Sequence, residues 1–429
     1  MRYTEYKDSQ IPWMGMVPSH WKLEKAKWSF ALRNERGNNI PVLLAATQKY
    51  GMYPQDLIEG VVKVAEGTDV QQFRTVHTGD FVISLRSFQG GFERSDYEGV
   101  CSPAYQVFYA NERWNTNYLK YLLKNELFID AMNALTVGIR EGKNIKYEDF
   151  ANSVLAIPPI IEQETIAPFL DKKIAHIDSV IAEAKASIEE YKAWKASIIY
   201  EAVTKGLDPN VEMKDSGIEW IGRIPMHWKR CKIKQVADAY NGDRSSNYPS
   251  GDDIVSEGVP FITSNNLGAI TLSTENGKNK YITEEKYSSL RGAKLQLNDI
   301  VFCLRGSVGK CSINKQYDCG TIASSLVVFR ANRINPDYLN YVLQNRVITE
   351  MALTTAIGIG SLNLSAENIM GFPIAIPPVD EQRDISIYLD NKCKAIESLI
   401  AEKESLIVDL ETYKKSLIFE AVTGKRRVY

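Results

Sequence analysis

The chain lacks the segments that mark a membrane or secreted protein. No run of about 18 consecutive apolar residues occurs, which is the length that a membrane-spanning helix needs. The opening MRYTEYKDSQ has no apolar core of the kind that a secretory signal peptide contains. We therefore expect a cytoplasmic protein with no membrane partner. An excess of charge is also missing, since the formal net charge is −2, and this neither requires nor excludes a nucleic-acid partner.

Cysteine and histidine are sparse and scattered. None of the six cysteines forms a CxxC pair, so neither a disulfide framework nor a zinc site of that type is indicated. Cys303, Cys311 and Cys319 are evenly spaced, but no cluster of His or carboxylate residues stands near them, and we predict buried strand cysteines. The four histidines are His20, His77, His176 and His227. They form no Ser-His-Asp or metal-binding pattern, and no metal is expected.

Two enzyme motifs are also missing. An amino-methyltransferase needs a polar residue before two prolines and an aromatic residue after them. The two Pro-Pro pairs, in Ile157–Ile160 and Ile376–Val379, have aliphatic residues on both sides. The segment Arg305–Cys311, RGSVGKC, contains Gly-Lys but lacks the first glycine and the hydroxyl residue of a P-loop. The chain is predicted to be noncatalytic and to bind no cofactor.

A long internal repeat is present instead. Residues 157–204 align with residues 376–423 without a gap at an offset of 219, and 22 of 48 positions are identical. The pattern KDSxIxWxGxxPxHW of Lys7–Trp21 recurs in Lys214–Trp228 at an offset of 207. Between these matched ends the two halves differ in sequence and length. Constant frames around divergent inserts predict one scaffold that presents two different binding domains.

The repeated segment at the end of each half has a heptad pattern. Apolar residues follow a 4-3-4-3 spacing, which is typical of a coiled coil. The expected seam residues are Leu170, Ile174, Ile177, Ile181, Ile188, Leu389, Ile396, Ile400, Ile407 and Leu410. Pro-Pro precedes each segment and suits a helix start. Pro168 has no counterpart in the second copy and predicts a kink or a later start of the first helix.

We expect the two long helices to pair with each other in an antiparallel coiled coil. This arrangement relates the halves by a pseudo-twofold axis and places the inserts at opposite ends of a rod. The expected domains are 1–156 and 207–375, with the long helices in 157–206 and 376–429. Each insert is predicted to be a mixed α/β domain. The expected strands are 41–46, 80–85, 106–109, 259–263, 299–304 and 325–329, the expected helices are 117–127 and 336–345, and Gly-rich loops are expected at 137–143 and 357–363.

Polar and basic side chains at flexible loop tips suit the reading of DNA, because base edges require hydrogen-bonding groups and phosphates require cations. Basic residues follow each repeated Trp-Lys, and they include Arg33 and Arg36. The other candidates in the first half are Arg86, Ser87, Gln89, Arg94, Arg140 and Lys143. Those in the second half are Ser264, Asn265, Asn266, Arg305, Ser307, Lys310 and Asn363. Any one of them alone is more simply a turn or surface residue, and only the paired arrangement favours DNA binding.

The chain resembles the DNA-specificity subunits of type I restriction-modification systems. The resemblance rests on the repeated opening, the IPPxxEQ helix entries at Ile157–Gln163 and Ile376–Gln382, the EAVT helix ends, and Ser102–Tyr105 in the first insert. It covers essentially the whole chain.

The resemblance implies a bipartite double-stranded DNA target, with each insert reading one half and the coiled coil fixing the gap between the halves. It also implies two modification subunits, which methylate adenine with S-adenosylmethionine, and restriction subunits, which use ATP and Mg. These cofactors would belong to the partners and not to this chain.

Two other classes of function stay open on the residues alone. The chain is compatible with a structural adaptor whose coiled coil mediates self-association and whose inserts bind protein. Heptads alone do not distinguish pairing within one chain from dimerisation. An enzyme that itself transfers methyl groups or cleaves DNA is the weakest alternative. Neighbouring genes for an adenine methyltransferase and a helicase-nuclease would favour the specificity role.

Overall fold

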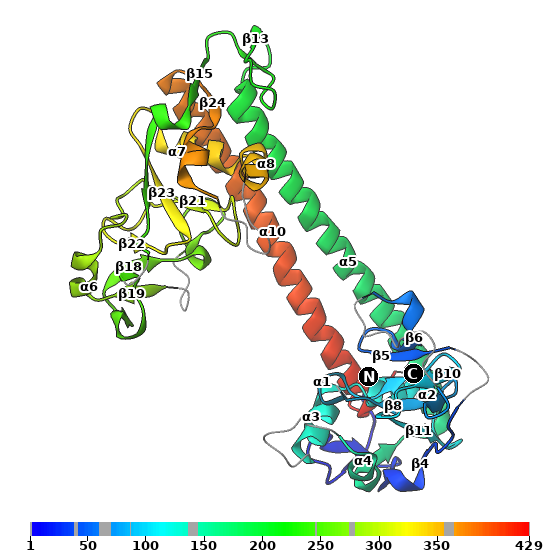
Figure 1. Cartoon of the computed structure of the whole chain (residues 1–429). Helices are drawn as coiled ribbons and strands as arrows, with labels where there is room; N and C mark the ends of the chain where they lie inside the picture. Colours follow the sequence, from blue (N-terminus) through cyan, green and yellow to red (C-terminus); the bar gives the residue numbers. More distant parts are fainter. Residues whose placement is uncertain are drawn as a thin grey trace. The chain divides into compact units, whose positions relative to one another are not determined.

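The computed structural model describes residues 2–37, 42–59, 70–85, 87–135, 145–244, 247–273, 279–355 and 364–428. The chain divides into two compact units. Unit 1 comprises 1–184 and 405–429, and unit 2 comprises 185–404. Both long helices contribute to both units, so each unit contains one insert with part of each helix (Figure 1).

Unit 1 is built around a four-stranded antiparallel sheet in the order β4-β11-β8-β9. Its strands are β1 (Tyr6–Asp8), β2 (Met16–Pro18), β3 (Lys22–Lys25), β4 (Phe30–Leu32), β5 (Leu44–Thr47), β6 (Gly51–Pro54), β7 (Arg74–Val76), β8 (Phe81–Ile83), β9 (Glu93–Arg94), β10 (Gly99–Cys101), β11 (Gln106–Ala110) and β12 (Val154–Ile157). Its short helices are α1 (Ser87–Gly90), α2 (Thr116–Leu122), α3 (Glu126–Leu135) and α4 (Tyr147–Asn152).

Unit 2 repeats this sheet in the order β16-β23-β20-β21. Its strands are β13 (Met213–Asp215), β14 (Arg223–Pro225), β15 (Lys229–Lys232), β16 (Ala237–Asn241), β17 (Ile254–Val255), β18 (Val259–Ile262), β19 (Lys280–Ile282), β20 (Ile300–Cys303), β21 (Cys311–Ile313), β22 (Thr321–Ile322), β23 (Leu326–Ala331) and β24 (Pro373–Ile376). Its short helices are α6 (Glu284–Ser289), α7 (Pro336–Gln344), α8 (Arg346–Thr355) and α9 (Ala366–Met370). The fold is therefore mixed α/β, as predicted.

Alternation along the strands gives each central sheet two apolar faces. In unit 1, Phe81, Ile83 and Phe108 join the core that includes the long helices, whereas Val82 and Val107 join a smaller core with β5, β6, β7 and β10. We call the part of unit 1 formed by β5, β6, β7 and β10 its second lobe. The second lobe of unit 2 is formed by β17, β18, β19 and β22, and Val301 and Val328 pack against it.

The two long helices are α5 (Ile160–Lys205) and α10 (Val379–Val422). In unit 1 the first half of α5 shares a core with the end of α10, through Leu170 and Leu417. In unit 2 the end of α5 shares a core with the first half of α10, through Val203 and Leu389. The helices therefore pack antiparallel within each unit, as predicted. Pro168 lies inside α5, so the helix does not start after it.

The expected seam residues lie between the helices. Leu170, Ile177, Ile181, Ile188, Leu389, Ile396 and Ile400 are buried, and Ile174, Ile407 and Leu410 are half-buried. Two lysines at equivalent positions of the helices, Lys195 and Lys414, form matching ion pairs. Lys195 Nζ lies 2.6 Å from Glu397 Oε1 in unit 2, and Lys414 Nζ lies 2.7 Å from Asp178 Oδ1 in unit 1. Both members of one pair match those of the other at the offset of 219, which supports a common antiparallel register.

The repeated sequence motifs join each insert to a helix start. In unit 1, Trp21 Nε1 and His20 Nε2 lie 3.0 and 2.5 Å from the carboxylate of Glu162. In unit 2, Trp228 Nε1 and His227 Nε2 lie 3.0 and 2.7 Å from that of Glu381. The next residue, Gln163 or Gln382, is buried and bonds backbone groups of its own unit.

The helix ends are joined to the inserts by a second matching contact. Tyr118 donates to the carbonyl of Val422 in unit 1, and Tyr338 donates to the carbonyl of Val203 in unit 2. The repeated EAVT ends therefore pack against the insert of the same unit. Together with the Glu contacts, they fix each insert to the start of one helix and the end of the other.

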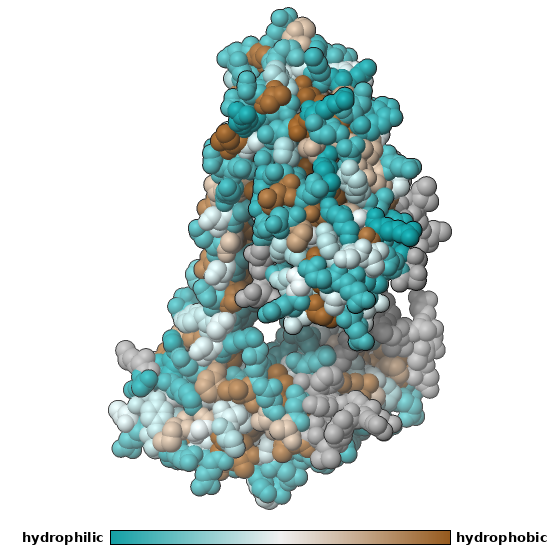
Figure 2. Space-filling view, turned by 90° about the vertical axis from the view of Figure 1, so that its left-hand side faces the viewer, coloured by the Kyte–Doolittle hydropathy of each residue, from teal (hydrophilic) through white to brown (hydrophobic). Residues whose placement is uncertain are grey.

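Some details differ from the sequence-based expectations. Cys303 and Cys311 are buried in strands, but Cys319 is exposed and lies in the connection between β21 and β22, so its expected burial was wrong. The Gly-rich loops 137–143 and 357–363 lie outside the described residues. Within the described ranges, no helix is long and apolar enough to cross a membrane. Figure 2 shows a face on which hydrophilic residues predominate and hydrophobic residues form separate patches.

Candidate nucleic-acid interface

In unit 2, the expected DNA-contacting residues come from two neighbouring segments. Ser264 and Asn265 lie in the short 3-10 helix after β18, and Arg305, Ser307 and Lys310 lie in the turn between β20 and β21. The segment after the 3-10 helix runs beside β21. Ser312 Oγ donates to the carbonyl of Gly268 over 2.8 Å, and Thr271 forms a parallel bridge with Ile313. This pairing brings the two polar segments to one edge of the unit.

The side chains at this edge differ in how far they reach solvent. Asn265, Ser307 and Lys310 are exposed, and Ser264 and Arg305 are half-buried. Asn266 is only 1% exposed, and its carboxamide oxygen accepts from the backbone N–H and the hydroxyl of Thr263, both over 2.9 Å. Because its polar groups hold the turn together, Asn266 is unsuited to reading a base edge.

In unit 1, Arg33 is held by carboxylates. Its Nε and Nη2 donate to the two oxygens of Asp80 over 2.6 and 2.8 Å, and its Nη1 donates to Glu35 over 2.7 Å. The hydrogen bond to Asp80 is the main cause that raises the pKa of Arg33. Arg33 also stacks on the ring of Tyr109, 4.7 Å from its centroid. A guanidinium with these partners is a structural brace, so the expected phosphate contact at Arg33 is not supported.

The remaining candidates of unit 1 lie apart from one another. Arg36 is exposed and donates to Gln72 Oε1 over 2.9 Å, Gln89 is exposed at the end of α1, and Arg94 is half-buried on β9 and pairs with Asp96. The last candidates of the two halves, Arg86, Arg140, Lys143, Asn363 and the side chain of Ser87, lie outside the described residues.

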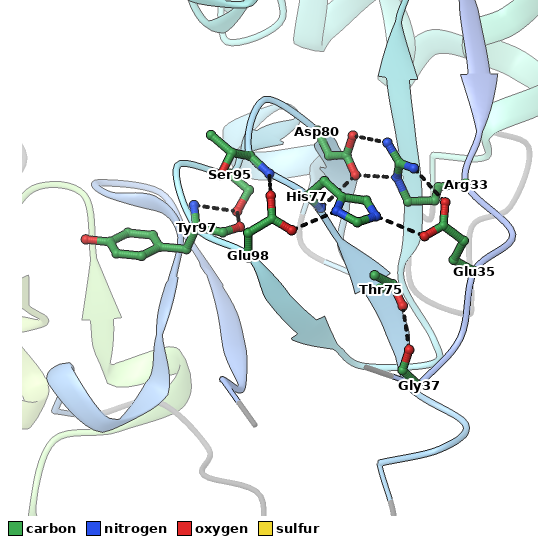
Figure 3. Close-up of polar contacts among 10 residues, drawn as sticks. Arg33, Glu35, Gly37, Thr75, His77, Asp80, Ser95, Tyr97 and Glu98 are labelled. Atoms are coloured by element: carbon green, nitrogen blue, oxygen red, sulfur yellow. Dashed lines mark hydrogen bonds and ion pairs between the residues drawn. The ribbon is translucent and has the colours of Figure 1, made fainter. Parts of the chain in front are cut away.

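A charged network surrounds the turn between β7 and β8 (Figure 3). His77 lies between two carboxylates, with Nε2 2.9 Å from Glu35 and Nδ1 2.7 Å from Glu98. The hydrogen bond to Glu35, aided by that to Glu98, raises the pKa of His77 above its usual value. A protonated ring donates to both carboxylates at once. With Arg33 and Asp80, the network contains three carboxylates and one guanidinium around His77, so it is a poor site for phosphate and holds the turn together instead.

The hairpin of β5 and β6 supplies a feature that the sequence analysis missed. Its turn carries Lys49, whose Nζ lies 4.8 Å from the ring centroid of the exposed Tyr50. Tyr50, Tyr53 and Tyr97 form a row with centroid separations of 5.2 and 5.3 Å. The three rings and Arg94 line a cleft of about 620 Å³ beside the helices of unit 1. The sequence KYGMY, a basic and two aromatic residues around a glycine, was the available signal.

Unit 2 has a cleft of similar size, about 600 Å³, in the matching position. The equivalent helix residues Asp178 and Glu397 line the two clefts. The lining of unit 1 contains Lys49, Arg94, Lys120, Lys124 and Lys414 against Asp96 and Asp178. The lining of unit 2 contains Lys315 and Lys394 against Asp337, Asp390 and Glu397. The lining of unit 1 therefore contains more cations than carboxylates together with tyrosine rings, whereas that of unit 2 contains more carboxylates than cations.

Comparisons with known proteins agree with this architecture. A family model described as the type I restriction modification DNA specificity domain matches residues 225–406. The MjaVIII specificity subunit of Methanocaldococcus jannaschii is 26% identical over 322 residues, covering 72% of this chain and 70% of that protein. The EcoBI specificity subunit of Escherichia coli is 20% identical over 393 residues, covering 88% of this chain and 74% of that protein.

Solved structures share the fold. A chain from a structure of type I restriction-modification complex assembly has a TM-score of 0.69 and 14% identity, and the match covers 95% of this chain and 98% of that one. The HsdS subunit from Thermoanaerobacter tengcongensis has a TM-score of 0.52 and 16% identity, covering 96% and 98%. The repeated sequence motifs and the repeated central sheet of this chain agree with these matches. The family model over residues 225–406, the specificity-subunit relatives and the shared fold all point to the DNA-specificity subunits of type I restriction-modification systems.

Proposed function

We propose that unit 1 and unit 2 each read one half of a bipartite double-stranded DNA target. The observation that carries the proposal is the pair of identical sheet orders whose edges carry different polar side chains. Reading two different base sequences requires different hydrogen-bonding side chains. Holding those side chains in equivalent places requires the same central sheet in both units. The duplicated frame and the divergent edges meet both requirements.

The contacts that we propose for unit 2 are Ser264, Asn265, Arg305, Ser307, Lys310 and Asn363. Those for unit 1 are Arg36, Arg86, Ser87, Gln89, Arg94, Arg140 and Lys143, to which the hairpin adds Lys49 and Tyr50. Arg33 is left out because two carboxylates hold its guanidinium, and Asn266 is left out because it is buried and bonds Thr263. Cations in these sets serve the phosphates, and the amide and hydroxyl groups suit the base edges.

We propose that the paired helices fix the gap between the two half-sites. The buried seam and the matching ion pairs at Lys195 and Lys414 support a defined helix register. Removing one heptad from each helix shortens both by seven residues, or about 10 Å at 1.5 Å per residue. The expected result is a recognised site with a shorter gap and unchanged half-sites, measured as the methylated sequence in an assembled complex. An unchanged gap in an active complex would contradict the spacer role.

We propose that the surfaces of the helices bind two modification subunits, to which restriction subunits are added. The support is a pair of exposed aromatic residues at equivalent positions, Trp194, which is 50% exposed, and Tyr413, which is 46% exposed. Ile160 and Val379, at the two helix starts, are likewise equivalent and exposed. Two equivalent surfaces suit two copies of one partner. S-adenosylmethionine, ATP and Mg would be used by these partners.

The reading role is tested by changing one edge. Replacing Asn265, Ser307 and Lys310 together with alanine removes three exposed polar groups from unit 2 without touching its core. The expected result is relaxed methylation at one half-site only, because each lost base contact costs discrimination of about 1–3 kcal/mol. Methylome sequencing of cells that carry the assembled system measures it. Unchanged discrimination in both halves would contradict the proposed edge, and equal relaxation in both would contradict separate reading.

A further inference from the structure

A cluster of Asp, Arg and Tyr lies beside the central sheet of each unit, and it is built in two different ways. In unit 1, Arg33 follows β4 and Tyr109 lies on β11. The guanidinium donates to both oxygens of Asp80, over 2.6 and 2.8 Å, and its Cζ lies 4.7 Å from the Tyr109 centroid. Asp80 is 2% exposed, so the pair is shielded on the carboxylate side.

Unit 2 contains the same cluster with two residues exchanged. Arg330 lies on β23 and Tyr240 lies on β16. The guanidinium donates to both oxygens of Asp299 over 2.8 Å, and its Cζ lies 4.8 Å from the Tyr240 centroid. Asp299 is 1% exposed.

Strand register shows that the exchange is reciprocal. Val107 pairs with Val82, and Val328 pairs with Val301, so Tyr109 and Arg330 occupy equivalent positions two residues further on. The offset of 207 that relates the two repeated openings makes Arg33 equivalent to Tyr240. Arginine and tyrosine have therefore changed places across two neighbouring strands, while the aspartate and the contact geometry are the same.

In both units the cluster reaches the connection between the central sheet and the second lobe. In unit 1 the carboxylate of Asp80 also accepts from the backbone N–H of His77, directly after β7 of the second lobe (Figure 3). In unit 2 that of Asp299 accepts from the backbone N–H of Gln296, and Arg330 also donates to the carbonyl of Lys294. Leu295 and Ala293 beside these groups are buried in the second lobe. The cluster thus ties the second lobe to the sheet.

We propose that these Asp-Arg-Tyr clusters are positioning devices that hold each second lobe in the orientation that DNA reading needs, and that their arginine and tyrosine are interchangeable. The inference rests on the proposed function, because the second lobes carry Lys49 and Tyr50 in unit 1 and adjoin Ser264 and Asn265 in unit 2. A bidentate Arg-carboxylate pair fixes direction as well as distance, and the ring face fixes the plane of the guanidinium. Either strand can supply either partner.

The test compares single and double exchanges in the full chain assembled with its modification subunits. R33Y and Y109R each break the cluster of unit 1, whereas R33Y/Y109R rebuilds it in the form seen in unit 2. The measurement is the ratio of methylation rates on the target duplex and on a duplex altered in one half-site. Because both rates come from one preparation, a smaller folded fraction leaves the ratio unchanged.

Each single exchange is expected to lower discrimination about tenfold in the half-site of unit 1, and the double exchange to restore it to within about threefold of the original chain. Discrimination in the other half-site stays constant. A double exchange no better than the worse single one would overturn the proposal. If a single variant does not fold, R33K keeps the charge but loses the bidentate fork, and it should show the same half-site-specific loss.

The mirror set, Y240R, R330Y and Y240R/R330Y, should give the same pattern in the other half-site. If the single exchanges lower discrimination and the double exchange does not restore it, the arginine and tyrosine are not interchangeable. The proposal that each unit reads its own half-site is then unaffected. Equal loss in both half-sites from one set contradicts separate reading itself. The two failures are therefore distinguishable.

Discussion

Unit 1 and unit 2 have the same central sheet and differ in the side chains around it. Both tie a buried Trp to a Glu at a helix start, and both pair a Lys of one long helix with a carboxylate of the other. Their clefts differ in charge, and the arginine and tyrosine of the Asp-Arg-Tyr clusters have exchanged strands. The contacts that attach each insert to the helices are the same in both units, whereas the cleft surfaces and the contacts that tie the second lobe to the sheet differ.

The largest expected effect breaks the shared attachment. Trp21 and Trp228 are fully buried, and replacing either with alanine is expected to destabilise its own unit by about 3–5 kcal/mol. Hydrogen exchange followed by mass spectrometry localises the loss. Trp21→Ala should increase exchange in unit 1 and Trp228→Ala in unit 2. Equal increases in both units from one variant would show that the units do not unfold separately.

The second prediction concerns the equivalent exposed aromatics. Trp194→Ala and Tyr413→Ala are each expected to weaken binding of one modification subunit by about 2 kcal/mol, the magnitude typical of a central interface residue. Titration by analytical ultracentrifugation should show one weakened site out of two. As a matched control, Lys192→Ala changes an exposed residue of the same helix turn, paired with Glu189. Unchanged affinity in both aromatic variants would place the partner elsewhere.

The third prediction uses a difference between the sheets. Glu93 on β9 is buried, and its counterpart on β21 is Ser312. Burial raises the pKa of Glu93 to about 7, against the opposing effect of Lys124, whose Nζ lies 2.6 Å from Glu93 Oε2. Because the folded state holds this proton more tightly than the unfolded state, stability is lost as the pH rises from about 4.5 through 7. Glu93→Gln should remove a dependence of about 1–3 kcal/mol from unit 1.

Thermal unfolding at pH 5 and pH 8 measures this difference. The variant should gain most over the original chain at pH 8 and little at pH 5. Ser312→Ala, the matched change in unit 2, should shift stability equally at both values. A larger gain at pH 5 would reverse the sign and contradict the burial of an ionisable Glu93.

The smallest expected effect concerns the helix ion pairs. Exchanging the charges of one pair, as Lys195→Glu with Glu397→Lys, should restore most of the stability that either single reversal loses. Each loss should be about 0.2–1 kcal/mol, because the pairs are partly exposed. Chemical denaturation of the single and double variants gives the coupling energy. The pair Lys414 and Asp178 should give a similar coupling energy. If neither pair shows a coupling energy, the ion pairs do not contribute to the register of the two helices.

Much of the fold followed from the sequence because local signals repeat. The two heptad patterns predicted both long helices. The alternating apolar runs predicted β8, β11, β18, β20 and β23 to within a few residues. The repeat also made antiparallel pairing within one chain the simplest arrangement.

The candidate site was harder to predict because its partners are distant in sequence. Arg33 and Asp80 are 47 positions apart in the sequence, and the residues next to Arg33 do not show that its guanidinium binds the Asp80 carboxylate. The burial of Asn266 depends on a turn in which it bonds Thr263, and the exposure of Cys319 depends on where β21 ends. An alignment shows the reciprocal exchange of arginine and tyrosine only as two mismatches, and it does not show that in each unit the arginine binds the aspartate and lies over the tyrosine ring.

The most direct measurement exchanges the whole insert of unit 1. Replacing residues 35–150 with the corresponding insert of another family member, and sequencing the methylome of cells that carry the assembled system, tests separate reading. The account predicts a new base sequence in one half-site, with the other half-site and the gap unchanged. A target unchanged in both halves, or altered in both, from an active complex would contradict it.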